Sequence, residues 1–258
     1  MFTIVQFSPT GNTAHIADLL SNYLETDQVY ALEHTSPTYL PNTGHIIILY
    51  AIHAFNAPKT VKRFINNMPK NKFNKVSLIG VGCNDSWLNY AASKDIRYML
   101  EAKHYPVVVD EIIAMPLTFI MSFPEDVINN QITEAHNKIK KLSFDIKESV
   151  VSEKNLMFKS RLVHWIGRIE PFAAKFFGLE LHSTKKCTQC GLCIKECPEH
   201  NIRMRDNGKL KFGMKCMMCM RCIYNCPSQA IVPRISKFIP LKNGYSIEQH
   251  LKKGDANE

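Results

Sequence analysis

The sequence lacks the features that would carry a chain into or across a membrane. The N-terminal run Met1–Phe7 is apolar but short and has no basic residues, which argues against a signal peptide. Even the most apolar longer stretch, residues 162–181, is interrupted by charged residues and Pro171, so it predicts no transmembrane segment. We therefore expect a cytoplasmic protein, in a compartment where thiols stay reduced.

The chain also has none of the common nucleotide-binding motifs. It contains neither the Gly-Lys-Ser/Thr phosphate loop nor the three-glycine dinucleotide fingerprint, so direct hydride input from a nicotinamide cofactor is not expected.

Its content of 45% hydrophobic and 21% charged residues is typical of a globular protein rather than a disordered one. The length of 258 residues allows one ordinary domain and a smaller one.

Cysteine is nearly absent outside one segment, because eight of the nine cysteines lie between residues 187 and 226. They form two runs that each read C-x2-C-x2-C-x3-C-P and begin 29 residues apart, at Cys187 and Cys216. This spacing is used to hold cubane iron–sulfur clusters, and the fourth cysteine typically ligates the other cluster. We therefore predict two 4Fe-4S clusters, one held by Cys187, Cys190, Cys193 and Cys226, the other by Cys216, Cys219, Cys222 and Cys197.

Two other uses of cysteine fit these runs less well. A zinc ribbon joins two C-x2-C pairs across a longer spacer, and it uses neither a third closely spaced cysteine nor the closing Cys-Pro. A disulfide framework needs an oxidising compartment, and we find no targeting signal for such a compartment in the sequence. We therefore favour iron–sulfur clusters over zinc and over disulfides.

The two cysteine runs belong to an internal repeat. Residues 186–202 and 215–231 align without a gap and share a lysine, four cysteines, a proline and two isoleucines. Residues 202–212 predict a short hairpin about Asn207-Gly208, a pair that readily takes positive φ. We expect apolar side chains of the repeat to shield the clusters from water: Ile194, Ile202, Ile223, Ile231, Met217, Met218 and Met220.

The N-terminal part alternates strand patterns with helix patterns, which predicts an α/β fold with a parallel sheet. Strands are expected at residues 2–7, 28–32, 45–51, 75–81 and 106–113. Helices are expected at residues 13–24, 58–67, 88–101 and 125–147. Five strands with interleaved helices predict the flavodoxin-like doubly wound order, in which a ligand lies beyond the carboxyl ends of the strands.

The loop after the first strand predicts a phosphate site. The segment Ser8-Pro9-Thr10-Gly11-Asn12-Thr13 is rich in hydroxyls, has one glycine and leads directly into a helix. Backbone N–H groups, hydroxyls and the helix dipole together form a phosphate cradle that needs no lysine. An ordinary capped helix start is the alternative. The position of the loop in the strand pattern favours the phosphate of FMN, bound by Ser8, Thr10, Gly11, Asn12 and Thr13.

These motifs together resemble a known kind of protein. Residues 1–150 look like a flavodoxin-type domain, through Phe7-Ser8-Pro9-Thr10-Gly11-Asn12-Thr13 and the order of the strands. Residues 185–235 resemble a bacterial two-cluster ferredoxin. The chain as a whole resembles the flavodoxin–ferredoxin fusion proteins of anaerobic bacteria, and this resemblance implies one non-covalent FMN and two 4Fe-4S clusters.

By analogy with flavodoxins, two further loops should flank the isoalloxazine ring of FMN. The residues of these loops that we expect at the flavin are Ala54, Phe55, Asn56, Gly82, Cys83, Asn84 and Trp87. We expect Phe55 and Trp87 to stack on the ring, or else to anchor their loops. Asn56 and Asn84 are candidates for the polar edge of the ring. Cys83 is expected to be a small buried residue rather than a redox thiol.

The predicted organisation has four parts. An FMN domain (1–150) is followed by a helical connector (151–182), a ferredoxin domain (183–236) and a loosely ordered tail (237–258). In the connector, apolar residues recur at helical spacing beside basic ones. Such a helix lies on a membrane surface or packs against neighbouring domains. We favour packing here, because electron exchange needs domains in a fixed relation.

The formal net charge of +9 suggests nucleic-acid binding at first sight. Eight ligating thiolates, two oxidised clusters and a flavin phosphate would lower that charge to roughly +3. We therefore expect no nucleic acid as a partner. A mildly positive surface favours redox partner proteins instead, such as an acidic ferredoxin or a flavoenzyme.

Together the predicted cofactors indicate an electron-transfer protein that links one- and two-electron redox partners. One alternative is FMN-dependent reduction of a small molecule, with the clusters as electron feed. Another is that the clusters are structural or sensory. Flavodoxins crowd acidic groups around the flavin, whereas the two flavin loops here contain only Asp85, so we expect the reduced flavin to be less destabilised.

Overall fold

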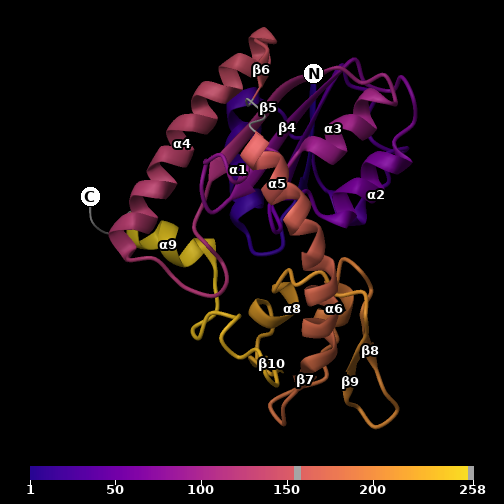
Figure 1. The fold of residues 1–258 in the computed structure, drawn as a ribbon, viewed down its shortest axis with the longest axis vertical. Coiled ribbons are helices and arrows are strands. Elements are labelled where there is room, and N and C mark those ends of the chain that lie inside the picture. The colour runs from indigo at the N-terminus through magenta and orange to yellow at the C-terminus, as the bar shows by residue number, and fades with distance from the viewer. Residues whose placement is uncertain (154–157, 255–258) are drawn as a thin grey trace. The chain divides into compact units, whose positions relative to one another are not determined.

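The computed structural model describes residues 1–153 and 158–254, which form two compact units (Figure 1). Unit 1 consists of Met1–Pro116 and Pro124–Arg168, and unit 2 of Leu117–Phe123 and Ile169–Glu258.

The predicted connector is not a body of its own in this division, because the boundary between the units falls at Arg168. Residues 154–157 of the connector and 255–258 of the tail lie outside the described residues. Segment 117–123 belongs to unit 2 through two hydrogen bonds. The Ile120 amide donates to the Ile239 carbonyl (2.6 Å), and the Tyr224 hydroxyl donates to the Thr118 carbonyl (2.6 Å).

Unit 1 is built on a parallel sheet with the strand order β2-β1-β3-β4-β5-β6. Its strands are β1 (Phe2–Phe7), β2 (Val29–Ala31), β3 (His45–Ala51), β4 (Lys75–Gly82), β5 (Val107–Ala114) and β6 (Ser152–Glu153). The predicted α/β class and all five predicted strands are confirmed, and the order of β1 to β5 is that of flavodoxin-like folds. The sequence missed β6, because two residues are too few to give an alternating pattern.

Helices cover both faces of this sheet, so its central strands are buried on both sides. The helices of unit 1 are α1 (Asn12–Leu24), α2 (Lys59–Asn67), α3 (Lys94–Glu101), α4 (Glu125–Glu148), α5 (Phe158–Ile166) and the 3-10 helix η1 (Leu32–His34). Helix α1 packs on α4, and α2 packs on α3 (Figure 1). The side chains of residues 46–49 in β3 are fully buried between these layers.

The prediction for the third helix was wrong at its start, because α3 begins at Lys94 rather than at residue 88. The preceding residues form successive turns, in which the Ala92 amide bonds to the Asn89 carbonyl. The Asn89 side chain in turn donates to the Asn84 carbonyl at 3.0 Å. This bond ties the segment to the loop after β4 and removes it from the helix.

Helix α5 lies in the predicted connector, and the packing of its apolar stripe against a neighbouring domain stays a prediction. Phe158 and Trp165 are 82% and 63% exposed. The buried side of the helix carries Ser160, His164 and Gly167 instead. At Gly167, directly after the helix, no side chain fits, because a Cβ there would lie 2.0 Å from the Ala54 carbonyl oxygen.

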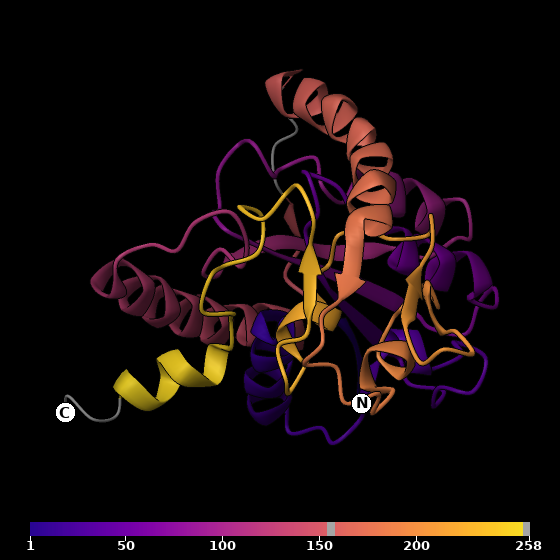
Figure 2. The same cartoon turned by 90° about the horizontal axis from the view of Figure 1, so that it is seen from below.

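Unit 2 consists of short elements around the cysteine runs. They are α6 (Glu170–Glu180), β7 (Leu181–Ser183), α7 (Leu192–Lys195), β8 (Ile202–Met204), β9 (Leu210–Phe212), α8 (Arg221–Tyr224), β10 (Ile231–Pro233) and α9 (Ile247–Gly254). The 3-10 helix η2 (Gly167–Ile169) precedes α6. Strands β7 and β10 pair antiparallel, as Figure 2 shows, and β8 and β9 form the predicted hairpin. Helix α9 shows that the predicted loose tail was wrong for residues 247–254.

The sequence repeat is also a structural repeat. Helix α7 and helix α8 occupy equivalent positions in the two cysteine runs, as do strands β8 and β10. Left-handed backbone conformations recur in the same places: φ is 59° at Gln189 and 52° at Met218, and 47° at His200 and 48° at Gln229. The chain therefore wraps in the same way around each run of cysteines.

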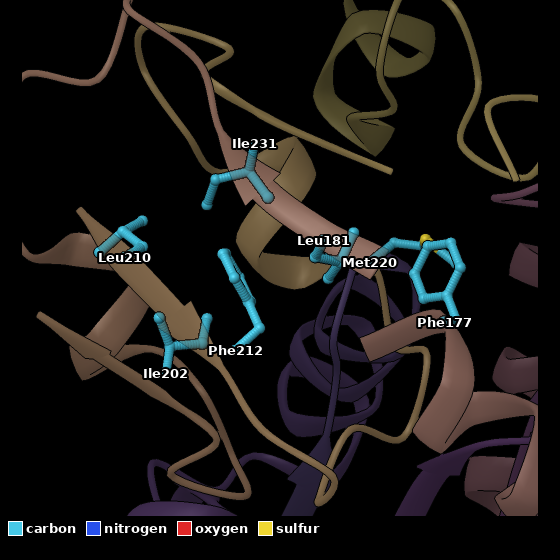
Figure 3. Packing of buried hydrophobic residues seen from close by; sticks show 7 residues of the cluster. All are labelled: Phe177, Leu181, Ile202, Leu210, Phe212, Met220 and Ile231. Atoms are coloured by element: carbon cyan, nitrogen blue, oxygen red, sulfur yellow. The ribbon is translucent and has the colours of Figure 1, made fainter. Parts of the chain in front are cut away.

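A small apolar cluster forms the core of unit 2 (Figure 3). Its buried members are Phe177, Leu181, Ile202, Leu210, Phe212, Met220 and Ile231. Partly buried side chains packed on it include six of the eight repeat cysteines together with Ile194, Ile223 and Met218. Isoleucines and methionines of the repeat thus pack beside the cysteines, and the shielding of clusters from water stays a prediction.

No helix in residues 1–153 and 158–254 is long and apolar enough to cross a membrane.

Candidate functional site

The first of two cavities in unit 2 is lined by the cysteines of the first run and one cysteine of the second. Its sulfur-bearing residues are Cys187, Cys190, Cys193 and Cys226, and its apolar wall includes Leu192, Leu210 and Ile231. About 330 Å³ of space lies among these residues, and part of it is open to solvent. At Gly191 the chain takes φ +76°, a left-handed conformation that favours glycine and turns the backbone around the cavity.

The second cavity has the complementary set of cysteines. It is lined by Cys197, Cys216, Cys219 and Cys222 together with Phe177, Phe212 and Ile223. About 430 Å³ of space lies among them, and part of it is open to solvent. Helix α6 lies directly against it, because a Cβ on Gly178 would come within 2.3 Å of the Cys216 Cβ. Each cavity thus takes three cysteines from one run and the fourth from the other.

Backbone amides are directed at the sulfurs in a repeated way. The Asn201 amide donates to Cys197 Sγ and the Ala230 amide donates to Cys226 Sγ, both at 3.3 Å. These are the two cysteines that cross between the runs. Hydrogen bonds to cluster sulfurs are among the terms that set reduction potentials.

The electrostatics of the thiols point to a positive group in each cavity. Burial and the neighbouring Cys226, Cys187 and Cys190 raise the pKa of Cys193 to about 11. Burial above all raises the pKa of Cys219 to about 12. Thiolates at Cys193 and Cys219 therefore need a nearby positive charge, which the iron of a cluster would supply.

No group of three or more His, Cys, Asp or Glu side chains in the described residues is placed to hold a single metal ion. A single zinc ion requires sulfurs about 2.3 Å from one point. The four cysteines that line each cavity are not grouped in this way in the described residues. This arrangement fits a multi-atom cluster better than one ion.

In unit 1, the loop after β1 presents a buried polar group without a partner. Thr13, at the start of α1, is 1% exposed, and its Oγ1 has no hydrogen-bond partner within the part of the chain that the structure describes. Gly11 caps the helix with φ +101°. The Ala14 amide donates to Ser8 Oγ at 2.9 Å, which closes the loop over the helix N-terminus.

The remaining residues of this loop are placed as follows. The Asn12 side-chain amide donates to the Pro116 carbonyl at 2.9 Å, so it holds the loop after β5 rather than pointing outward. Thr10 is partly exposed beside Gly11. The helix N-terminus, the orphan hydroxyl of Thr13 and the glycine turn together fit a phosphate group.

The loop after β3 is a tight turn in a strained conformation. Ala54 and Phe55 have φ of 42° and 64°, which non-glycine residues rarely adopt. His53 and Asn56 exchange two backbone hydrogen bonds of 3.0 Å and 2.9 Å across the turn. The Asn56 side-chain amide donates to the Ala54 carbonyl (2.9 Å) and to the His164 carbonyl of α5 (3.1 Å).

The loop after β4 is held by its own side chains. Asn84 Oδ1 accepts from the Ser86 hydroxyl at 2.6 Å, and its amide nitrogen donates to Cys83 Sγ at 3.4 Å. The Cys83 carbonyl accepts from Gln131 of α4 at 2.7 Å. Burial raises the pKa of the Cys83 thiol, as for a packed rather than a reactive cysteine.

The rest of this loop presents one aromatic side chain and one acid. Trp87 is 39% exposed, and Gly82 packs against Ile52. The carboxylate of Asp85 forms an ion pair with Lys138 of α4, which also lies 3.5 Å from Glu111. Lys138 therefore neutralises Asp85, the single acid of the two loops expected at the flavin. Although Lys138 lies close to other lysines in the sequence, it is not simply a solvated surface residue.

Sequence reasoning missed one part of this site, the contact of α5 with the loop after β3. His164 is buried and contacts Asp95 Oδ1 at 3.1 Å, and Asp95 is also bonded to Lys62 at 2.5 Å. Burial by itself would raise the pKa of Asp95. The charges and hydrogen bonds of Lys62 and His164 outweigh this effect and lower that pKa to about 2. The only signals of this contact in the sequence were His164 and Gly167, which stand among the apolar residues of the predicted helix.

Comparisons with known proteins give a family match for unit 2 and structural neighbours for unit 1. Residues 180–227 match the family model of the 4Fe-4S dicluster domain. Among solved structures, a Streptococcus pneumonia flavodoxin is 16% identical with a TM-score of 0.43, over 58% of this chain and 99% of that one. Flavodoxin 2 from Bacillus cereus is 17% identical with a TM-score of 0.42, over 57% and 97%.

The two-electron reduced flavodoxin of Megasphaera elsdenii is 19% identical with a TM-score of 0.38, over 54% of this chain and 99% of that flavodoxin. No curated protein matches the chain. The strand order of unit 1 carries the assignment of its fold, and the family match carries that of unit 2. The chain therefore joins an α/β unit with the flavodoxin-like strand order to a segment that matches the 4Fe-4S dicluster domain, which is consistent with a flavodoxin–ferredoxin fusion.

Proposed function

We propose that this protein passes electrons between one FMN in unit 1 and two 4Fe-4S clusters in unit 2, and so links one- and two-electron redox partners. The observation that carries the proposal is the pair of four-cysteine cavities, each completed by the fourth cysteine of the other run. FMN exchanges one or two electrons and each cluster exchanges one. The two kinds of cofactor in one chain are therefore suited to splitting or joining an electron pair.

The residues of unit 2 hold the clusters and keep water away from them. We assign Cys187, Cys190, Cys193 and Cys226 to one cluster, and Cys216, Cys219, Cys222 and Cys197 to the other. The apolar core around the cysteines, including Phe177 and Phe212, limits access of solvent. The amides of Asn201 and Ala230 stabilise negative charge on the crossing sulfurs.

In unit 1, the loop after β1 would hold the phosphate of FMN. The Thr13 hydroxyl and the backbone N–H groups at the start of α1 would donate to it, and Gly11 allows the close approach of the chain. The strained turn at Ala54 and Phe55 and the exposed ring of Trp87 would flank the isoalloxazine. We expect Asn56 to fix the Ala54 carbonyl rather than to bond the ring, since its amide already donates there.

The charge around the flavin loops supports a flavin that is not tuned to a very low potential. Nearby negative charge disfavours the anionic hydroquinone and lowers the potential of its formation. Here the one acid of the loops, Asp85, is paired with Lys138. A redox titration is expected to place the semiquinone/hydroquinone couple above that of flavodoxins with acidic flavin surroundings; an equally low couple would contradict this proposal.

The function is tested by anaerobic purification followed by counts of iron, sulfide and FMN and an EPR-monitored titration. We expect about eight irons and one FMN per chain, with EPR signals from two clusters. The control is Cys83→Ser, which changes the one cysteine outside the runs and should leave the iron count unchanged. Fewer than about eight irons in a fully loaded sample would overturn the two-cluster assignment.

The flavin arm is tested separately with Thr13→Val, which removes the orphan hydroxyl and keeps the shape of the side chain. We expect the Kd for FMN to rise about tenfold, the loss of one hydrogen bond to a charged group. Thr38→Val, at an exposed position, is the matched control. Steady turnover of a small acceptor by the loaded protein would favour the alternative, an FMN-dependent reductase.

A further inference from the structure

Most of the large apolar side chains of helix α6 in unit 2 are exposed rather than buried in the core of the unit. Ala174, Phe177 and Gly178 are buried. Phe172 and Phe176, in contrast, are 61% and 70% exposed. Ile169, just before the helix, and Leu179 are exposed in the same way. The helix thus presents a continuous apolar face away from its own unit.

The contact with the second cysteine cavity fixes this orientation. Phe177 lines that cavity, and a Cβ on Gly178 would lie 2.3 Å from the Cys216 Cβ and 3.1 Å from the Gly213 carbonyl oxygen. A rotation that buried Phe172 or Phe176 would drive a large ring into this space. The outward direction of the apolar face is therefore built into the packing of α6.

The segment after β10 extends the apolar face at the C-terminal end of α6. Its backbone is tied to the helix, since the Ile235 and Ser236 amides donate to the Glu180 carboxylate at 2.7 Å and 3.0 Å. Ile235 and Phe238 in this segment are 85% and 69% exposed. We call these six side chains the α6 apolar surface: Ile169, Phe172, Phe176, Leu179, Ile235 and Phe238.

The charges that border the α6 apolar surface are mainly positive. Lys175 lies over the Phe172 ring at 5.0 Å, and Arg234 and Lys237 are exposed in the segment after β10. The acid at this end, Glu180, accepts hydrogen bonds from backbone amides, which lower its pKa although burial opposes them. Glu170 is at the opposite end, in the first turn of the helix.

Helix α5 of unit 1 has the same kind of surface when it is considered by itself. Phe158, Leu162 and Trp165 are exposed, and Lys159 and Arg161 stand beside them. Two separate helices with exposed aromatic residues and flanking cations are a second instance of the pattern. Monomeric soluble proteins rarely leave such contiguous apolar patches open.

We propose that the α6 apolar surface binds the surface of an anionic lipid bilayer. Aromatic side chains insert at the boundary of headgroups and acyl chains, while lysine and arginine beside them attract anionic headgroups. A second copy of the chain fits less well, because Lys175, Arg234 and Lys237 of two copies would face like charges. Coiled-coil pairing also prefers aliphatic residues and longer helices than the 11 residues of α6.

This inference goes beyond the proposed function and does not depend on it. It has one functional consequence, because the inner side of α6 lies on the second cysteine cavity. A helix with its side chains is about 10 Å across. Binding would therefore hold the candidate cluster site of Cys216 close to the bilayer surface.

The test is co-sedimentation of the full-length, cluster-loaded protein with phosphatidylglycerol vesicles and with phosphatidylcholine vesicles. We expect binding to the anionic vesicles that weakens as salt is raised, and little binding to the neutral ones. The double variant Phe172→Ser/Phe176→Ser should bind the anionic vesicles at least about tenfold more weakly, since two aromatic rings no longer insert. Lys175→Glu should weaken binding mainly at low salt.

The matched control is Phe144→Ser on α4, which also replaces an exposed phenylalanine and should bind as the parent does. Iron counts and far-UV circular dichroism show whether each variant is folded. Equal binding by Phe172→Ser/Phe176→Ser and the parent would overturn the proposal. A second set of results would also overturn it: light scattering shows that the parent is a dimer, the variant Phe172→Ser/Phe176→Ser abolishes that dimer, and the parent does not bind vesicles.

Discussion

Units 1 and 2 are stabilised in different ways. Unit 1 has a wide sheet whose central strand, β3, is buried along residues 45–50, with helices on both faces. The apolar core of unit 2 contains seven buried residues, and cysteine side chains make up much of what packs on it. A core of that size contributes little on its own, whereas metal–ligand bonds contribute folding free energy directly.

The backbone shows the same difference. The strands of unit 2 are three residues long and helices α7 and α8 are four residues long, so local hydrogen bonding stabilises them only weakly. Non-glycine residues such as Gln189, Met218 and Met220 hold positive φ around the cysteines. From this comparison we expect unit 1 to fold without a cofactor and unit 2 to depend on the clusters proposed for it.

Removal of the clusters should have the largest effect. After extraction of iron with an oxidant and a chelator, we expect hydrogen-exchange protection of strands β7 to β10 to fall at least about a hundredfold. Protection of β3 and β4 should stay as it was, because their core contains no cysteine ligand. Hydrogen-exchange mass spectrometry separates the two units; unchanged protection in both would contradict the comparison.

Loss of one crossing cysteine should have the next largest effect. Cys226→Ser is expected to reduce the iron count from about eight to about four per chain, because it empties the cavity of the first run. Adding Cys190→Ser to Cys226→Ser should then cost no further iron, whereas adding Cys219→Ser should remove the rest.

Cys197→Ser is the matched variant for the opposite cavity. With it, Cys219→Ser should cost nothing more and Cys190→Ser should remove the remaining iron. If instead each run held its own cluster, the outcomes of the two pairs would be exchanged. Such an exchange would sink the crossed assignment of Cys197 and Cys226.

Acid should destabilise unit 1 through His45. Burial, together with the charge of Lys75, lowers the pKa of His45 from 6.5 to about 4. The folded state therefore keeps the ring neutral, so His45 contributes stability above pH of about 6.5 that is lost as the pH falls toward 4. His45→Gln should flatten this loss by up to about 3 kcal/mol in urea unfolding measured between those two pH values.

Glutamine retains the possibility of a hydrogen bond to Ser77, which His45 makes at 2.8 Å. His34→Gln, at an exposed position, is the control and should leave the pH dependence unchanged. Part of the dependence should remain in His45→Gln, because burial also lowers the pKa of His15 and His136. A curve identical to that of the parent would show that His45 does not limit the acid stability of unit 1.

The smallest effect concerns the contact of α5 with the flavin loop. Gly167→Ala would place a Cβ 2.0 Å from the Ala54 carbonyl oxygen, so the loop after β3 must shift. We expect the Kd for FMN to rise about tenfold while the iron count is unchanged. Gly44→Ala, whose Cβ would meet only Asn74 at 3.9 Å, is the control. An unaltered Kd for FMN would mean that α5 does not position this loop.

Much of unit 1 followed from local patterns. The apolar runs at 45–51 and 75–81 predict buried strands because both sheet faces are covered, and they were observed within a residue. The start of α3 did not follow, because Asn89 bonds to the Asn84 carbonyl and keeps its segment in turns. Strand β6 gave no pattern, since its pairing with β5 depends on residues far apart in the chain.

The candidate sites divide in a similar way. The glycine and hydroxyls of residues 8–13 predicted the phosphate loop, but the burial of Thr13 and the bond of Asn12 to Pro116 depend on the loop after β5. The polar side chain of Asn56 suggested a flavin contact, whereas the fold directs its amide to His164 of α5. The spacing of residues in the sequence does not predict a contact of this kind.

The sequence by itself determined the two cysteine runs, their repeat and the alternation of strands and helices, because these depend on residues close together in the chain. Tertiary structure decided the bond of Asn12 to the Pro116 carbonyl and which face of α6 remains exposed. The reason is that both outcomes depend on long-range packing. Gly178 must fit against Cys216, and this contact turns Phe172 and Phe176 outward.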